Sequence, residues 1–420
     1  MNQHSNLIKQ NGIYLQSILI AFIGLIVIFQ PILQMYVEFV GYTDEMLAFI
    51  SLVVILVNLC LGRLSKNHLK ILVLMIFAII IGFFSNIFSG LVISNMAIFT
   101  DILLCFKVFL VYIGFQYIFP NIKYNYCGLN ILSFFMKIYV LIIFFFALLH
   151  LSGIYVMGTE IRYGIRSFQF IFDGAGNFNT MFYAPILVLS YSMYTNKNGK
   201  KNTIIFISML LFVWITTLRT RSFCFVIIYI YLFFTYIIRK KSIKLNIINI
   251  VVIAILIALV GYDQFEMYFS NDATPRYKLL YYGFVTFKDH FPLGSGFATY
   301  GTDAAFKWYS PLYYNYGFNN IWGMDPNNGM FVHDTYWPAI IAEFGIFGTI
   351  LFLLIITNIF KEFYKKNKRD SIALFSIVFI IITQIVSSVA TATFFHPITV
   401  SLFFICALLK TNNYNERNQI

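Results

Sequence analysis

Two kinds of side chain in this sequence have the chemistry of a ligand-binding or reactive site: arginines that suit phosphate, and a histidine that suits proton transfer. Arg219 and Arg221 lie in the segment Thr217-Leu218-Arg219-Thr220-Arg221-Ser222, Arg276 follows a Thr-Pro pair, and His333 precedes Asp334. The planar guanidinium fork matches phosphate oxygens, and a neutral histidine can accept a hydroxyl proton near neutral pH. These residue types predict a site that holds an anionic group and activates a hydroxyl.

Each of these residues also has a simpler structural interpretation. Arg219 and Arg221 could extend to lipid headgroups, Arg276 could be a solvated helix end, and His333 could contact a headgroup. Tyr336 and Trp337, which follow shortly after, are typical of the aromatic belt at a membrane surface. Taken one at a time, the residues leave both interpretations open.

Apolar helices must position these residues. Of the 420 residues, 60% are hydrophobic and 11% are charged, whereas a soluble domain has roughly 25% charged residues. Apolar runs of about 20 residues recur along the chain, the length that crosses a bilayer as helix. We predict an all-α polytopic membrane protein with about twelve spans, forming a single integral membrane domain over residues 1–420. The predicted spans are 13–30, 44–62, 69–87, 97–119, 130–152, 178–195, 203–218, 222–238, 246–261, 337–360, 371–391 and 394–410.

The net charge of +12 does not indicate nucleic-acid binding. Most of the 29 Lys and Arg residues lie in short connectors between alternate spans, such as 361–369, and build no basic face. The positive-inside rule assigns these connectors and both chain termini to the cytoplasm. The five cysteines fall in spans or cytoplasmic connectors, so we expect neither a disulfide framework nor a metal site.

Two exported loops are predicted. The first, 154–180, contains Arg162 and Arg166, and the second, 262–336, is long enough to indicate a function. Within the second, Thr274 and Pro275 can start a helix. Apolar side chains then recur at helical spacing: Tyr277, Leu280, Phe284, Phe287 and Phe291. We predict an amphipathic helix with one aromatic stripe that lies at the membrane–water boundary or packs against the bundle.

Some ionisable residues fall inside predicted spans, among them Asp101, Lys107 and Glu343. Such residues usually face the interior of a helix bundle and pair with each other there. We predict that Lys107 pairs with Glu343 or with Asp101.

Taken together, these residues resemble the O-antigen polymerase and O-antigen ligase superfamily of bacterial inner-membrane glycosyltransferases. The resemblance is carried by Thr274-Pro275-Arg276-Tyr277 with Leu280, by Phe291-Pro292-Leu293-Gly294-Ser295-Gly296-Phe297 with Tyr300, and by His333-Asp334-Thr335-Tyr336 with Glu343-Phe344-Gly345-Ile346-Phe347-Gly348. Many members have His-Asn where this chain has His333-Asp334. The segment 217–222 is similar to the family's Ser/Thr-x-Ser-Arg turn, which leaves either Arg219 or Arg221 as its arginine. The region 162–179 resembles the family's preceding exported loop more weakly.

The resemblance implies a fold like that of class C glycosyltransferases and a metal-independent, inverting transfer that uses no cofactor. The implied donor is a glycan on polyprenyl pyrophosphate, and the implied acceptor is a hydroxyl of a second lipid-linked repeat unit. Arg221 (or Arg219) and Arg276 would hold the pyrophosphate, and His333 would orient or deprotonate the acceptor hydroxyl. The further substrate-binding candidates are Arg219, Arg166, Arg162, Tyr336 and Glu343.

The implied function is a polymerase that joins repeat units into O-antigen or capsular polysaccharide at the exported face of the bacterial inner membrane. Membrane lipid and a chain-length regulator are its further candidate partners. One alternative is a ligase that moves finished polymer to a lipid core, and no residue separates it from the polymerase. A lipid-linked oligosaccharide flippase and a non-catalytic sugar-binding protein are alternatives of other classes. A flippase has no use for a long exported loop, so the loop argues against it.

Overall fold

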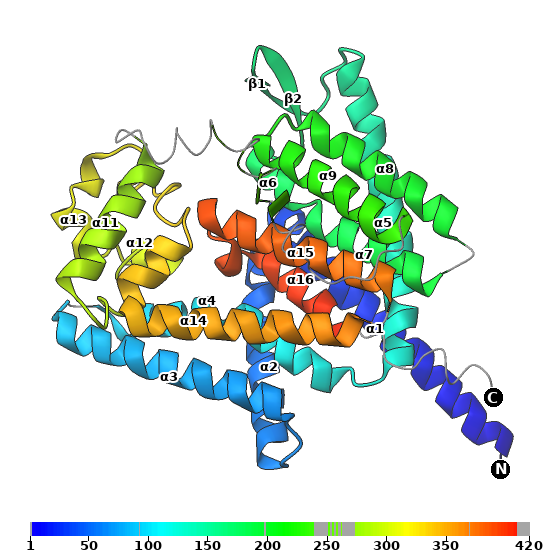
Figure 1. The fold of residues 1–420 in the computed structure, drawn as a ribbon, viewed down its shortest axis with the longest axis horizontal. Coiled ribbons are helices and arrows are strands. Elements are labelled where there is room, and N and C mark those ends of the chain that lie inside the picture. The colour runs from blue at the N-terminus through cyan, green and yellow to red at the C-terminus, as the bar shows by residue number, and fades with distance from the viewer. Residues whose placement is uncertain are drawn as a thin grey trace.

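The computed structural model of the chain is mostly helical and describes residues 2–91, 93–196, 199–238, 274–368 and 370–409, with single residues between 251 and 262 (Figure 1). The helices before residue 240 are α1 (Asn2–Leu33), α2 (Thr43–Cys60), α3 (Lys66–Ser89), α4 (Asn95–Ile118), α5 (Ile122–Leu151), α6 (Ala175–Thr180), α7 (Tyr183–Thr195), α8 (Lys200–Thr216) and α9 (Thr220–Phe233). The later ones are α11 (Pro275–Asp289), α12 (Asp303–Lys307), α13 (Pro311–Asn315), α14 (Trp337–Asn367), α15 (Ser371–Ala390) and α16 (Pro397–Leu408).

Eight segments of the described chain are long and apolar enough to cross a membrane, which makes this a multi-pass membrane protein. They are Leu15–Leu33, Glu38–Cys60, Lys66–Ser89, Asn95–Ile118, Ile122–Leu151, Thr220–Ile238, Trp337–Asn367 and Ser371–Ala390. The segment that begins at Thr220 joins α9 to a π-helical turn, Phe234–Ile238.

Eight segments is fewer than the twelve predicted spans. The difference arises because hydropathy does not show where a helix is interrupted or how long it is. The predicted span 178–195 is divided between α6 and α7, because the helix is interrupted at Met181 and Phe182 although the apolar sequence continues. α8 and α16 have 17 and 12 residues, fewer than the roughly 20 that cross the hydrocarbon layer. The predicted span 246–261 falls mostly outside the described residues.

α3 and α14 pack side by side and run antiparallel (Figure 1). At one end, Lys70 Nζ donates a hydrogen bond to Asn358 Oδ1 at 3.3 Å, and His68 Nε2 lies 3.0 Å from Glu362 Oε1. At the other end, Ser85 Oγ donates to the carbonyl of Leu293 at 2.7 Å. The basic connectors near residues 63–70 and 361–368 therefore share one end of the helix pair, and the large loop lies at the other.

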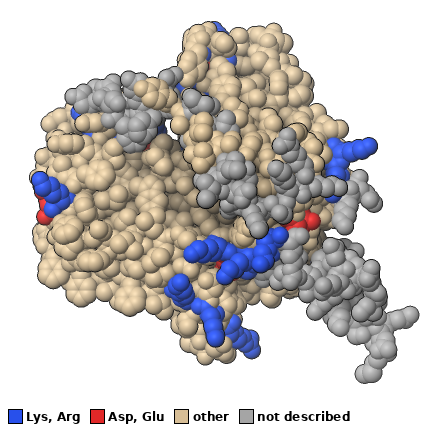
Figure 2. Space-filling view, in the orientation of Figure 1, with Lys and Arg blue, Asp and Glu red and all other residues tan. Residues whose placement is uncertain are grey.

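The surface charge follows the same arrangement. Figure 2 shows Lys and Arg side chains gathered on the lower part of the face that is turned to the viewer, around the ends of α2 and α3. The surface over α11 to α13 is mostly uncharged in the same view.

α14 is broken at Gly345, and the large loop is held in this break. Gly345 has non-helical backbone angles (φ 59°, ψ −157°). The carbonyl groups of Ala342 and Glu343 accept hydrogen bonds from the N–H groups of Ser295 and Gly296, both at 2.8 Å. On the other side of the break, Ile346 N–H donates to the carbonyl of Pro292 at 3.1 Å. Irregular backbone is tolerated inside a membrane protein where other protein groups satisfy it in this way.

Glycines allow the two backbones to approach so closely. A Cβ atom on Gly345 would lie 2.1 Å from the carbonyl oxygen of Pro292, and one on Gly294 would lie 2.5 Å from the Gly345 nitrogen. A Cβ on Gly296 would lie 2.5 Å from the backbone nitrogen of Asn86 in α3. All three glycines have positive φ, a region that other residues rarely adopt. These three glycines are therefore required for the loop to dock against α3 and α14.

The described part of the large loop, 274–336, is folded. α11 begins as predicted, because Thr274 Oγ1 accepts from the N–H of Tyr277 at 3.3 Å and Pro275 occupies the first helical turn. After α11, the loop builds a small core of its own around Tyr300, Tyr313, Phe318, Met324 and Val332, all buried. This core connects α11, α12 and α13 at one end of α14 (Figure 1).

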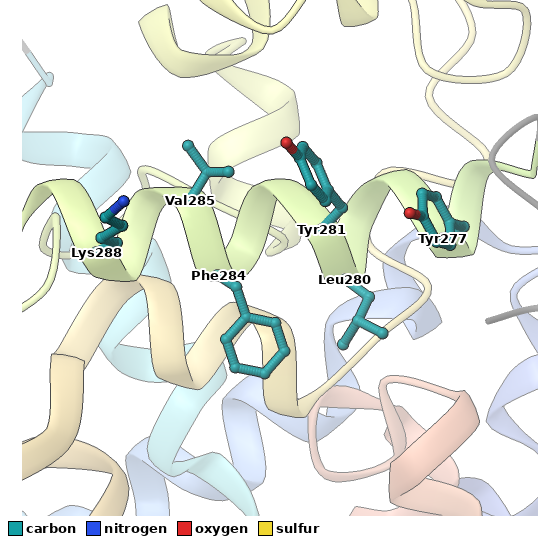
Figure 3. A pocket seen from close by; sticks show the side chains of 6 residues that line it. All are labelled: Tyr277, Leu280, Tyr281, Phe284, Val285 and Lys288. Carbon is teal, nitrogen blue, oxygen red and sulfur yellow. The ribbon is translucent and has the colours of Figure 1, made fainter. Parts of the chain in front are cut away.

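Of the predicted aromatic stripe of α11, Phe284 and the following Phe291 are exposed, and the other three members are partly buried. Leu279 and Gly283 face inward, where α11 packs on α14, and Tyr281, which was not predicted, is exposed as well. Figure 3 shows Leu280 and Phe284 on one edge of the helix and Tyr281 and Val285 on the other, around a surface hollow of about 320 Å³. Helix α11 thus packs on the bundle with one face and exposes aromatic side chains on the other.

The first of the two loops predicted to be exported contains a hairpin that the prediction of an all-α chain did not include. Strand β1 (Gly158–Arg162) pairs antiparallel with β2 (Ile165–Phe170), and Glu160 lies opposite Ser167. The two turn residues, Tyr163 and Gly164, both have positive φ, as a tight type I′ turn requires. This hairpin lies beyond α6 in Figure 1.

We expect Gly345→Ala to prevent normal folding, because the added methyl group would collide with the Pro292 carbonyl and the docked backbone has no room to shift. Gly317→Ala is the matched control: Gly317 also has positive φ, but no atom lies within 4 Å of an added Cβ. Its cost should be limited to backbone strain of about 1–2 kcal/mol. Thermal unfolding in mild detergent measures the difference, and equal midpoints for the two variants would contradict the docking role of Gly345.

Candidate functional site

Arg276 and Asp334 form an ion pair at the start of α11 and α14. The Nε and Nη2 atoms of Arg276 lie 2.8 and 2.6 Å from Oδ2 of Asp334. The two side chains are 23% and 29% exposed, so solvent and ligands can reach the pair. Because α11 packs along the first part of α14, the arginine at its start is held beside the residues that precede α14.

Arg221 and His333 act on the same carboxylate. Burial raises the pKa of Asp334 above its usual value, although the charges of Arg276, His333 and Arg221 all act to lower it. Arg221 comes from the first turn of α9, far from the other three in sequence. The structure therefore pairs Arg276 with Asp334, which directly follows His333, and the charge of Arg221 reaches the same carboxylate.

His333 lies beside a carboxylate that the sequence analysis did not select. Its Nδ1 atom is 3.3 Å from Oδ1 of Asp303, the first residue of α12. The ring of Phe306, also in α12, lies 6.4 Å from the imidazole ring. Since the side chains of His333 and Asp303 are 39% and 62% exposed, the imidazole is open to a ligand hydroxyl.

Arg162 and Arg166 lie in the β-hairpin, and Arg219, at the start of α9, contacts it. Arg162 Nη2 lies 3.1 Å from Glu160 Oε1, and Arg219 Nη2 lies 3.3 Å from Glu160 Oε2. Burial would raise the pKa of Glu160, but the hydrogen bond from Arg162 and the charge of Arg219 outweigh it, so this pKa is lowered. The guanidinium of Arg166 stacks over the ring of Tyr155 at 4.4 Å. Arg219 is thus paired with the hairpin, whereas the charge of Arg221 acts on Asp334.

Tyr336, a predicted substrate-binding residue, is fully buried. Its ring packs against Trp337, Phe394 and Phe395, with ring centroids 5.1, 5.0 and 4.9 Å away. These contacts hold the start of α14 against the connection between α15 and α16. Tyr336 supports the position of its neighbours Asp334 and His333.

Glu343, another predicted substrate-binding residue, is also fully buried. Its Oε1 atom accepts hydrogen bonds from the N–H groups of Thr299 and Tyr300 at 2.9 and 3.0 Å. Together with its main-chain carbonyl, which accepts from Gly296, the side chain fixes the segment that enters the break in α14. We therefore assign Glu343 a structural role in the docking of the loop.

Glu343 shares its buried position with Asp101 of α4. Asp101 Oδ2 accepts from the N–H of Ala298 at 2.8 Å, and the two carboxyl side chains are within hydrogen-bonding reach of each other. We predict that Asp101 and Glu343 share one proton, because two ionised carboxylates side by side in a buried site would repel each other. Cys105 brings a third potential ligand atom within 4.8 Å, which is a spacing that would suit a metal ion. The main-chain N–H donors already stabilise the remaining negative charge.

The predicted pairing of Lys107 with Glu343 or Asp101 is wrong. Lys107 forms a buried ion pair with Asp44 of α2, and its Nζ lies 3.6 Å from Glu45 Oε1. Gln30 of α1 supports this pair, because its Nε2 donates to Asp44 Oδ1 at 2.7 Å. Spacing along the sequence could not show this contact, since it depends on how α1, α2 and α4 pack together.

His396 is a further site candidate that the sequence analysis missed. It caps α16, with Nδ1 accepting from the N–H of Ile398 at 3.2 Å. Burial lowers the pKa of His396 to about 4, and the charges that act on its imidazole are, in decreasing order, those of Lys107, Asp44, Asp303 and Arg221. A His-Pro pair at the start of a helix is typical of a helix cap, so the pattern does not indicate a function.

An apolar pocket of about 150 Å³ opens beside Arg276, between α11, α14 and the end of α15. Arg276 and Thr335 form its polar end, and apolar side chains such as Phe284, Ile341 and Val389 line the rest. Such a lining suits a ligand with an anionic head and an apolar chain.

No protein-family model matches the chain, and a search of curated proteins finds no similar sequence. The assignment of a function therefore depends on the contacts of the site itself.

The shared proton predicts how Glu343 responds to substitution. Glu343→Gln should change the free energy of unfolding by no more than about 1 kcal/mol, because the amide oxygen keeps both main-chain hydrogen bonds and the amide N–H₂ donates to Asp101. Glu343→Ala removes these contacts and leaves Asp101 buried without its partner, which should cost about 3 kcal/mol or more. Unfolding midpoints in detergent compare the two variants. A Gln variant as unstable as the Ala variant would exclude the shared proton.

Proposed function

We propose that this chain is a glycosyltransferase that joins polyprenyl-pyrophosphate-linked oligosaccharide repeat units into O-antigen or capsular polysaccharide. The observation that carries the proposal is that Arg276 pairs with Asp334, next to His333, and that the charge of Arg221 reaches the same carboxylate. Two guanidinium groups can hold a diphosphate, and one imidazole can take a proton from a hydroxyl. These are the groups that a transfer from a diphosphate donor to a sugar hydroxyl requires.

In the proposed reaction, the acceptor hydroxyl oxygen bonds to the anomeric carbon of the donor, and the bond from that carbon to the diphosphate breaks. His333 takes the hydroxyl proton, and the polyprenyl diphosphate leaves with the electron pair of the broken bond. Arg276 and Arg221 stabilise the negative charge that develops on it, a contribution of about 3 kcal/mol for one well-placed donor. Attack opposite the leaving group inverts the anomeric carbon. The scheme uses neither a metal ion nor a cofactor.

The pocket beside Arg276 supports a lipid-linked donor. Its polar end contains one of the arginines proposed to hold the diphosphate, and its walls are apolar. A polyprenyl chain that extends from the diphosphate into this pocket would bury apolar surface, which is favourable by about 25 cal/mol per Å². A soluble nucleotide-sugar donor would gain nothing from such walls.

The proposal places residues 262–336 on the exported face of the bacterial inner membrane and both chain termini in the cytoplasm, in a fold like that of class C glycosyltransferases. The packing of α3 against α14 supports this arrangement, because basic connectors lie at one end of the pair and the candidate site lies at the other. Positively charged connectors prefer the cytoplasm.

The experiments described below also test two alternative functions, a ligase and a flippase. A ligase that transfers finished polymer to a lipid core would use the same arginines and histidine. A flippase would line a central cavity with charged side chains, but the buried Lys107 is engaged by Asp44 and Glu45 in the described part of the chain. The contacts therefore favour an enzyme.

His333→Ala should abolish visible product without affecting accumulation of the protein, because general-base assistance contributes about 10²- to 10⁴-fold and the side chain is partly exposed. For a polymerase, surface glycans should collapse to single repeat units. For a ligase, the surface should carry no repeats, and long polymer should build up on the polyprenyl carrier. Gel separation of surface glycans and of the extracted lipid-linked pool distinguishes these results. A normal ladder from a normally expressed variant would refute the role of His333.

The separation of the two neighbouring arginines predicts unequal effects. Arg221→Lys and Arg276→Lys should each lower polymer formation at least about tenfold, because an ammonium cannot replace a bidentate fork on phosphate oxygens. Arg219→Lys is the matched control, since an ammonium can still pair with the exposed Glu160 carboxylate. Polymer length and amount at equal protein levels measure the effect. If Arg219→Lys were as damaging as Arg221→Lys, the assignment of Arg221 to the diphosphate would fail.

A further inference from the structure

We propose that Asp303 is a positioning residue that holds the proton of neutral His333 on Nδ1, so that Nε2 is left to accept the hydroxyl proton. The role of His333 in the transfer depends on the function proposed above. The Asp303–His333 pair itself depends only on the geometry of α12 and of the residues before α14.

The first argument is the position of the two groups. Asp303 Oδ1 lies 3.3 Å from His333 Nδ1, and this nitrogen is closed off from solvent without a hydrogen-bond partner in the described structure. Asp303 is the carboxylate within reach of this nitrogen. The distance allows a hydrogen bond, but the two groups are not aligned for one in this structure, so a small rotation of a side chain must form it. Catalytic hydrogen bonds are often poorly aligned in the absence of substrate and tighten in the complex.

The second argument is that the fold holds Asp303 in this position. Thr302 is buried and caps α12, its Oγ1 accepting from the N–H of Ala305 at 3.2 Å. Ala304 and Ala305 are buried where α12 packs on α4. The short helix therefore has its small residues in the core and its first residue, Asp303, directed to His333. Asp303 therefore differs from a flexible surface carboxylate, because its neighbours Thr302, Ala304 and Ala305 are buried and hold its backbone in place.

The third argument is chemical. The partner of one imidazole nitrogen determines which nitrogen carries the proton, and a carboxylate at Nδ1 selects the Nδ1–H form. Nε2 then has a lone pair for the acceptor hydroxyl. When His333 takes the proton, the carboxylate also stabilises the positive imidazolium. The neighbouring Asp334 does not supply this contact, because its Oδ2 is engaged by Arg276.

The pair should matter little for folding. Both side chains are partly exposed, and ion pairs of this kind usually contribute little to stability. Variants at Asp303 should therefore insert and accumulate normally, which keeps the activity measurements interpretable.

The first test is spectroscopic and does not require activity. In protein labelled with ¹⁵N-histidine, subtracting the spectrum of His333→Ala assigns the signals of His333 among the six histidines. We expect Nδ1 to be protonated in the neutral wild type and the Nδ1–H population to fall in Asp303→Ala. Asp289→Ala, which removes an exposed carboxylate at the end of α11, should leave these signals unchanged. An unprotonated Nδ1 in the wild type would overturn the proposal.

The second test is kinetic, in membranes supplied with lipid-linked repeat units. Asp303→Ala should lower kcat at least about tenfold with little change in the KM of the acceptor, and Asp303→Glu should restore part of the loss. In the His333→Ala background, Asp303→Ala should have no further effect, because Asp303 acts through the imidazole. Additive losses would overturn the positioning role. If His333→Ala polymerised normally while the Nδ1–H signal depended on Asp303, the pair would stand and the proposed function would fall.

Discussion

The candidate site depends on the break in α14 at Gly345. The break provides the carbonyls of Ala342 and Glu343 for the N–H groups of Ser295 and Gly296, so the loop is fixed inside the bundle. α11 leads into this docked segment and α12 follows it, while His333 and Asp334 come directly before α14. One main-chain interaction therefore sets the positions of Arg276, Asp303 and His333 relative to each other. A loop of this length without such a fixed point could not hold three side chains in register.

Buried charges stabilise the docked arrangement without taking part in the proposed chemistry. Asp101 and Glu343 bind the main-chain N–H groups of residues 298–300, which lets a turn of irregular backbone lie inside the bundle. Lys107 is neutralised separately by Asp44 of α2. The membrane interior requires that each buried ionisable group has a partner. The partly exposed ion pair of Arg276 and Asp334 lies outside these constraints, where ligands can reach it.

The sequence predicted those parts of the fold that local patterns determine. Hydropathy located the long apolar helices, and the Thr-Pro pair at residue 274 correctly predicted the start of α11. Local sequence patterns could not predict tertiary contacts. The partner of Lys107, the proximity of Asp303 to His333 and the burial of Glu343 each depend on how distant helices pack. The β-hairpin was missed because Tyr163-Gly164 is a weak turn signal in an otherwise apolar chain. The spacing of the motif residues did not show that Glu343 holds the loop, whereas Arg276 and His333 are partly exposed at the site.

The turn between α8 and α9 shows how two nearby arginines come to have different environments. Leu218 has positive φ and Arg219 is extended, so the chain changes direction there before Arg221 enters the first turn of α9. Arg219 is held by Glu160 of the hairpin, whereas the charge of Arg221 acts on Asp334. Arg276 is balanced by Asp334. An anion that entered the site would therefore be attracted by Arg221 and would compete with Asp334 for Arg276. A diphosphate can do this because it offers more negative charge and more acceptor oxygens than a single carboxylate.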